Sequence, residues 1–299
     1  MLEVKNLTKR FGDFTALQDV SLSVEDGTVY GLVGYNGAGK TTLLKNIAGI
    51  YKPETGEVLF DGENIFENAN KKSQIFFMPD DLYFSSYANM DKMAAFYSGY
   101  YENFSFDTYR KLTEVFGLDP KKRINGFSKG MQRQAETVFA LATHPKLLLL
   151  DESFDGIDPQ KRVIMKGLLR ETIKENNTSV IISSHNLSEL EDLCDHIGII
   201  NGKKVVISGA VNEISNGRTK YRLAFARPFT LDEFDGLNCV GLKKDGQLAM
   251  FTINGSTDAA ESYIEKLAPA VVEKVSLSLE EIFLQEMEGA DYDFKEILG

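Results

Sequence analysis

A glycine-rich loop constrains the fold of this chain more than any other segment: Gly34-Tyr35-Asn36-Gly37-Ala38-Gly39-Lys40-Thr41. It fits the pattern G-x-x-x-x-G-K-S/T, follows a predicted strand at 28–33 and opens a predicted helix at 40–50. Glycines let backbone N–H groups turn inward onto phosphate oxygens, and the start of the helix adds the positive end of its dipole. The loop therefore predicts the strand–loop–helix phosphate site of an α/β fold.

Two side chains of this loop are expected to act directly. Lys40 can reach the β- and γ-phosphates of a nucleotide, and the Thr41 hydroxyl can be a ligand of Mg²⁺. The predicted nucleotide-binding residues are Tyr35, Asn36, Gly37, Ala38, Gly39, Lys40, Thr41 and Thr42.

A second segment carries paired carboxylates. The apolar run at 147–150 is typical of a strand buried in a parallel sheet, and it ends in Asp151 and Glu152. Asp151 is expected beside Mg²⁺, and Glu152 is expected to act as the general base that activates water. Together with the loop, these residues predict a nucleotide hydrolase with Mg²⁺ at its site.

Length and charge limit the alternatives. The 299 residues suggest about two domains, and 33 basic against 44 acidic residues give a net charge of −11. This acidic balance argues against a nucleic-acid partner. The longest stretch without charge, at 176–188, is too short and too polar to span a membrane, and we see no signal peptide, so we expect a cytoplasmic protein.

The chain changes character twice. Residues 82–109 hold ten of the 32 aromatic residues, which suggests either the core of a small helical insert or a surface of which part docks a partner. After 217, strands at 221–225, 248–253 and 271–277 alternate with helices, and Ser278 and Glu281 form a capping box before the last helix. We therefore expect domains at 1–217 and 218–299, the second a small α+β domain.

Further motifs narrow the family. Phe127-Ser128-Lys129-Gly130-Met131-Gln132-Arg133 resembles the signature motif of ATP-binding cassette (ABC) proteins. Ser153 to Pro159 resembles their D-loop, His185 their switch histidine, and Phe11 the aromatic residue that stacks on adenine. The resemblance covers about residues 2–216 and implies a nucleotide-binding cassette with a P-loop core and a helical insert at about 82–130.

The resemblance also implies how the site is completed. In this family two cassettes face each other head to tail, and each ATP lies between the loop of one and the signature motif of the other. Ser128, Lys129, Gly130, Met131 and Asp158 would then act in trans, most simply from a second copy of the chain. His185 would hold the γ-phosphate and orient the attacking water beside Glu152.

Three positions depart from the family pattern. Tyr35 replaces a usual proline, and the signature reads Phe-Ser-Lys-Gly-Met, a form frequent in bacterial exporters of the bacitracin-resistance type. Asp80 stands where a glutamine is common. Its carboxylate can still ligate Mg²⁺ but cannot donate a hydrogen bond.

The resemblance implies the ATPase subunit of a transporter that works on a separate integral membrane permease, at the inner face of the cell membrane. The short cassette and the C-terminal extension resemble exporters of drugs, lipids or antimicrobial peptides. The alternatives are a soluble ABC ATPase of translation or iron–sulfur assembly, an importer ATPase, and a regulatory subunit that binds nucleotide without hydrolysis.

Overall fold

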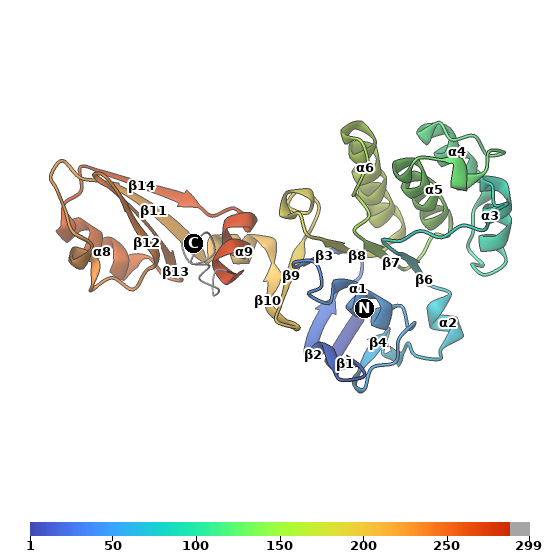
Figure 1. Cartoon of the computed structure of the whole chain (residues 1–299), viewed down its shortest axis with the longest axis horizontal. Helices are drawn as coiled ribbons and strands as arrows, with labels where there is room; N and C mark the ends of the chain where they lie inside the picture. Colours follow the sequence, from blue (N-terminus) through green and yellow to red (C-terminus); the bar gives the residue numbers. More distant parts are fainter. Residues whose placement is uncertain (288–299) are drawn as a thin grey trace, which may run out of the picture. The chain divides into compact units, whose positions relative to one another are not determined.

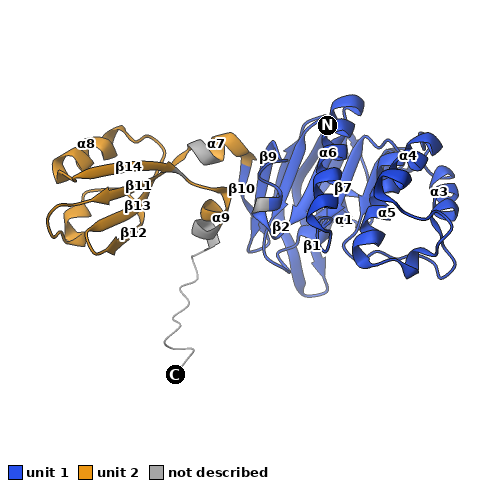
Figure 2. Ribbon diagram, turned by 90° about the horizontal axis from the view of Figure 1, so that it is seen from above, with its two compact units in different colours: residues 1–208 blue, residues 209–299 orange. Residues whose placement is uncertain are grey.

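The computed structural model describes residues 1–287, except the side chains at 188, 215, 216, 276 and 284–287. The chain divides into two compact units, Met1–Ser208 and Gly209–Gly299 (Figure 2). The boundary expected from the sequence, at 217, lies just after the short helix α7 (Val211–Asn216). Within residues 1–287, no helix combines the length and the apolar character that a membrane crossing requires.

A six-stranded sheet in the order β10-β9-β3-β8-β7-β6 forms the centre of the first unit. Its strands are β3 (Val29–Val33), β6 (Ile75–Met78), β7 (Leu147–Asp151), β8 (Ser179–Ser184), β9 (His196–Asn201) and β10 (Lys204–Ala210). Adjacent strands from β9 to β6 run parallel. The carboxyl ends of parallel strands meet at one edge, so the segments after β3, β7 and β8 converge there.

A smaller antiparallel sheet in the order β2-β1-β4-β5 covers the helix that follows the glycine-rich loop. Its strands are β1 (Leu2–Phe11), β2 (Phe14–Val24), β4 (Thr55–Phe60) and β5 (Glu63–Asn64). Helix α1 (Lys40–Ile47) buries Leu43, Leu44 and Ile47 in one core with residues of both sheets. Figure 1 shows α1 between the two sheets, with α6 (Pro159–Asn176) on the opposite face of the parallel sheet.

A helical insert follows β6. It contains α3 (Met90–Ser98), α4 (Phe106–Phe116) and α5 (Lys129–Ala142), and the short helix α2 (Ala69–Lys72) precedes β6. The rings of Tyr97 and Tyr109 pack against Phe139 of α5, with centroid distances of 5.2 and 6.2 Å. Other aromatic side chains of the segment are exposed: Tyr83, Tyr87, Phe96 and Tyr100. The insert thus has both an aromatic core and aromatic residues on its surface.

The second unit contains an antiparallel sheet in the order β12-β13-β11-β14. Its elements are β11 (Arg218–Ala224), β12 (Val240–Asp245), β13 (Leu248–Asn254), α8 (Asp258–Leu267), β14 (Val271–Ser276) and α9 (Leu279–Met287). Tyr221, Phe251 and Ile264 belong to its core, so the expected small α+β domain is confirmed. The predicted capping box is also confirmed, since Ser278 and Glu281 bond each other's backbone N–H groups at 3.2 and 3.1 Å. Of the four side chains expected on the buried face of the last helix, Leu279, Ile282 and Phe283 are buried, and that of Met287 lies outside the described residues.

One expected element is wrong. The sequence predicts a helix from about Asn186, but the structure has only a three-residue 3-10 turn, Leu187–Glu189, followed by further turns. The turns still bury Leu187, Leu190 and Leu193, which recur at helical spacing. Asp195 then accepts a hydrogen bond from the Val29 N–H at 2.8 Å, which fixes the start of β9 and leaves little chain for a helix.

Candidate functional site

The glycine-rich loop closes over the start of α1 as its pattern predicts. Gly39 caps the helix with φ 111°, a conformation that suits glycine and few other residues. A Cβ atom there would lie 2.8 Å from the Leu17 side chain and 2.9 Å from the Ala16 carbonyl. Glycine at this position therefore lets the loop pack against β2 while its N–H groups stay available to an anion.

Lys40 lies inside the loop. Its ammonium donates to the Gly34 carbonyl at 2.7 Å and the Tyr35 carbonyl at 3.4 Å, and it lies 3.1 Å from Glu152 Oε1. Only 6% of the side chain is exposed. The cation thus occupies the space that the loop surrounds, with a carboxylate as its partner.

Asp151 is held at the end of β7 by the neighbouring strand. Ser183 of β8 donates to Asp151 Oδ1 at 2.6 Å and accepts from the Glu152 N–H at 3.1 Å. Burial raises the pKa of Asp151, against the smaller, opposite effects of the Ser183 and Thr41 hydroxyls. Oδ2 of Asp151 is buried and has no hydrogen-bond partner among the described residues. This arrangement leaves one carboxylate oxygen beside Thr41 available to a cation.

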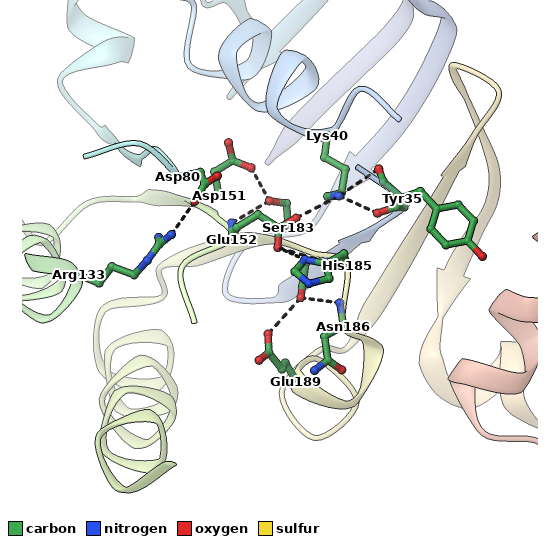
Figure 3. Close-up of polar contacts among 12 residues, drawn as sticks. Tyr35, Lys40, Asp80, Arg133, Asp151, Glu152, Ser183, His185, Asn186 and Glu189 are labelled. Carbon is green, nitrogen blue, oxygen red and sulfur yellow. Dashed lines mark hydrogen bonds and ion pairs between the residues drawn. The ribbon is translucent and has the colours of Figure 1, made fainter. Parts of the chain in front are cut away.

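Glu152 and His185 form a pair at the same edge of the sheet (Figure 3). Glu152 Oε2 lies 2.9 Å from His185 Nδ1 and also accepts from the His185 N–H at 3.3 Å. The hydrogen bond to Glu152 raises the pKa of His185. Glu152 has a left-handed backbone with φ 48°, which directs its side chain between Lys40 and His185. A base and a histidine in contact can position and deprotonate a water molecule.

A pocket at this edge, called the loop pocket below, is lined by seven of the eight nucleotide-binding residues predicted in the glycine-rich loop, and by Asp80 and Glu152. Its lining comprises Phe14, Ala16, Tyr35, Asn36, Gly37, Gly39, Lys40, Thr41, Thr42, Asp80 and Glu152. Phe11, the predicted adenine-stacking residue, is not part of this lining and packs against Tyr51 with a centroid distance of 5.3 Å. Phe14, which pairs with Phe11 across the β1–β2 turn, lines the pocket instead.

Comparison with known proteins decides the family. The model of the ABC transporter family matches residues 17–155. The Bacitracin transport ATP-binding protein BcrA of Bacillus licheniformis is 32% identical over 74% of this chain and 73% of its own length. The chain belongs to the ABC transporter ATP-binding family. It is accordingly an ABC ATPase, and ATP is its nucleotide.

Two further similarities describe the extent of the match. The ABC transporter ATP-binding protein YtrB of Bacillus subtilis is 29% identical over 97% of this chain and 99% of its own length. The solved ATP-binding subunit of an ABC transporter matches with a TM-score of 0.65 and 26% identity, over 72% of this chain and 92% of that one. The similarity to YtrB thus includes the second unit of this ABC ATPase.

Asp80 of this ABC ATPase makes a contact that sequence reasoning missed. Its Oδ1 accepts from Arg133 Nη2 of α5 at 2.6 Å, and the Arg133 side chain is only 10% exposed (Figure 3). Asp80 also lies near enough to Asp151 to raise its pKa, as a smaller contribution than burial. The Asp80 carboxylate thus lies between the predicted metal site and α5, the helix that begins in the signature motif and is called the signature helix below.

The signature motif and the D-loop pack on each other. A Cβ atom on Gly130 would lie 2.7 Å from the Gly156 carbonyl, so glycine is required where the two segments meet. Ser128 caps α5 by accepting from the Met131 N–H at 3.2 Å, and Asp158 caps α6 by accepting from the Lys161 N–H at 3.0 Å. The residues predicted to act in trans are absent from the lining of the loop pocket, as far as the described residues define it: Ser128, Lys129, Gly130, Met131 and Asp158.

Proposed function

We propose that this ABC ATPase powers export of a drug, lipid or peptide through a separate membrane permease. The convergence of Lys40, Glu152 and His185 at one edge of the sheet carries the hydrolytic part of the proposal. The similarity to a bacitracin transport protein, whose name states its cargo, supports transport over a soluble role. The form of the signature motif and the C-terminal extension, which resemble those of exporters, support export over import.

The chemistry follows from the contacts of Glu152. When the γ-phosphate of ATP enters the loop, the Lys40 ammonium exchanges its carboxylate partner for phosphate oxygens. Glu152 is then free to accept a proton from the attacking water. His185, already bonded to Glu152, donates toward the phosphate and orients that water.

Magnesium fits the donors at this site. Thr41 offers a hydroxyl, Asp151 offers its buried, unpartnered Oδ2, and Asp80 offers a second carboxylate at the pocket wall. Hard oxygen ligands of this kind suit Mg²⁺, and the ion when bound offsets the charge of the β- and γ-phosphates.

A second copy of the chain would complete the site. In the described part of the chain, no arginine lines the loop pocket, so one copy offers the γ-phosphate few cationic donors. Ser128 and the Gly130 N–H lie at the start of α5, a 14-residue helix whose dipole favours an anion. Donated from a partner copy, together with Lys129, Met131 and Asp158, they would close the ATP sandwich in an isologous dimer.

The permease would dock on the exposed aromatic residues of the insert. A groove there is lined by Tyr83, Ser85, Tyr87, Ala88, Lys92, Met93, Phe96 and Tyr97. Tyr83 is 90% exposed and Tyr87 is 70% exposed, and aromatic side chains of this kind are enriched in protein interfaces. The ATPase would therefore be peripheral on the inner face of the membrane, held there by the permease, with no nucleic-acid partner.

The test is a pull-down of the tagged full chain from detergent-solubilised membranes, followed by mass spectrometry of what co-purifies. We expect a membrane protein with several spans. We expect Tyr83→Ser combined with Tyr87→Ser to lose it while ATP binding is kept. Val163→Ser, which changes a residue 71% exposed on α6, is the control. Recovery from the soluble fraction with ribosomal or iron–sulfur assembly proteins would contradict the proposal.

The direction of transport needs a second experiment, with inside-out membrane vesicles. ATP-dependent uptake of cargo into these vesicles supports export, and ATP-dependent release of cargo from them supports import.

A further inference from the structure

A buried carboxylate lies close behind the histidine of the site. Glu189 ends the 3-10 turn after β8, and only 6% of its side chain is exposed. A buried charge is costly unless it is paired and hydrogen-bonded. Glu189 meets both conditions, since Oε1 lies 2.9 Å from Arg162 Nη1 and Oε2 accepts from the Ser184 hydroxyl at 3.1 Å. Its position is thus fixed from two sides.

The Ser184 hydroxyl links this carboxylate to the turn that carries His185. Besides donating to Glu189, its Oγ accepts from the Asn186 N–H at 2.9 Å. The hydrogen bonds therefore hold the residues before and after His185. The His185 side chain itself is 45% exposed and bonds to Glu152, so the shape of this turn decides where the imidazole lies.

Arg162 connects the same carboxylate to another part of the site. It lies one turn inside α6, and its N–H donates to the carbonyl of Asp158, the residue that caps this helix. The segment before the cap contains Gly156, whose carbonyl packs on Gly130 of the signature helix. A displacement of this segment and of the start of α6 would therefore move Arg162, and with it Glu189.

We propose that Glu189 is a positioning residue. Through Arg162 and Ser184, it makes the position of His185 depend on the position of the 155–158 segment. The inference rests on the proposed function, because it takes His185 to act in hydrolysis. It adds a connection within one chain: the segment expected to face a partner copy is linked, through three side chains, to the group that orients the water. Hydrolysis would then be slow until that segment is in place.

The test is a double-mutant cycle on the full chain, with steady-state ATPase kinetics as the measurement. We expect Glu189→Gln to lower kcat about tenfold and to change KM less than about twofold, because the carboxylate does not contact ATP. In the His185→Ala background, the same substitution should cause no further loss, since Glu189 acts only through His185. Arg170→Gln, which changes an exposed arginine of the same helix, is the control and should leave kcat unchanged.

Two further variants keep the test decisive if Glu189→Gln fails to fold. Ser184→Ala should reproduce the loss of kcat, and Arg162→Lys should retain more activity than Arg162→Gln because it keeps the charge. The proposal would be overturned if the losses of kcat caused by Glu189→Gln and His185→Ala multiply in the double variant. It would also be overturned if Glu189→Gln raises KM and leaves kcat unchanged. If His185→Ala alone leaves kcat unchanged, the assigned role of His185 in the proposed function fails, and the role of Glu189 fails with it.

Discussion

Glu152 lies between a cation and a histidine, and both contacts depend on its carboxylate charge. We expect Glu152→Gln to lower ATP turnover by a factor of roughly 100 or more, because an amide cannot accept the proton of water. ATP binding should persist, and the ATP-bound dimer should accumulate. Size-exclusion chromatography with ATP and a phosphate-release assay measure both effects. Glu175→Gln on the exposed face of α6 is the control. Hydrolysis at the parent rate would refute the role of Glu152 as base.

Phe11 and Phe14 are both candidates for the residue that stacks on the adenine of ATP. Phe11 and Phe14 face each other across the β1–β2 turn, but only Phe14 lines the loop pocket. Stacking of a base on an aromatic ring contributes about 1–3 kcal/mol, so we expect Phe14→Ala to weaken ATP binding at least about fivefold. Phe11→Ala is the matched variant and should change the affinity little. Titration with a fluorescent ATP analogue measures both, and the reverse result would support the assignment from sequence.

Sequence reasoning succeeded at this scale where neighbours in the chain are neighbours in space. Gly34 to Thr42 form one loop, so a pattern of adjacent residues predicts which side chains line its pocket. It did not place Phe14 in the pocket lining, because which side chain of the β1–β2 turn reaches the pocket depends on the conformation of that hairpin. It also missed Ser183, whose contact with Asp151 depends on the pairing of β7 with β8.

At the scale of elements, the ion pair of Asp80 and Arg133 joins the segment after β6 to the signature helix α5. If Asp80 also binds Mg²⁺, Arg133 competes with the metal for the same carboxylate. Asp80→Asn should then raise the Mg²⁺ concentration that gives half-maximal ATPase activity about three- to tenfold, and Arg133→Gln should lower it. If the ion pair is purely structural, both variants should shift the half-maximal Mg²⁺ concentration in the same direction. Metal titrations at saturating ATP distinguish the two outcomes.

The contact between α3 and α5 should make stability depend on pH. Tyr97 donates to the buried Glu136 at 2.9 Å, and burial raises the pKa of Glu136 to about 7 from 4.5. Between these values the unfolded chain releases a proton that the folded chain keeps, so this group lowers the free energy of unfolding as pH rises from about 4.5 to 7. Glu136→Gln should remove this loss, on the order of 1–3 kcal/mol at pH 8. Melting temperatures of both proteins at pH 5 and pH 8 provide the measurement, and equal changes in the two would contradict it.

The turn after β8 is a segment whose secondary structure the sequence pattern did not predict. The leucines at 187, 190 and 193 have helical spacing, yet the backbone forms short turns because Glu189 and Asp195 bind groups from outside the segment. Local periodicity contains no information about such partners. The strand at 147–151 was predictable because burial on both faces demands a continuous apolar run, which the leucines at 147–150 supply.

For the whole molecule, the two units allow a test of independent folding. Residues 1–208 contain both sheets of the cassette and the whole loop pocket. We therefore expect a chain that ends at Gly217 to fold and to bind ATP with the affinity of the full chain. Circular dichroism, thermal unfolding and nucleotide titration check this. An insoluble product would show that the second unit completes the core, contrary to the expected domain boundary.

The general architecture of this ABC ATPase could be predicted because its motifs lie in order along the chain and fix both the cassette and its insert. The α+β character of the second unit was also predictable from its alternating strands and the Ser278–Glu281 capping box. Its strand β12 was missed, because at 240–245 most residues are exposed and the apolar alternation is weak.

The strained backbone at position 152 has a consequence for attempts to stabilise this protein. A left-handed backbone costs a residue with a Cβ atom on the order of 1 kcal/mol, whereas glycine adopts it freely. Glycine would relieve that strain, but it would leave the Lys40 ammonium, only 6% exposed, without its carboxylate partner, which costs more. Engineers who want a more durable enzyme should therefore exempt this position from the usual replacement of left-handed residues by glycine and seek their gains elsewhere.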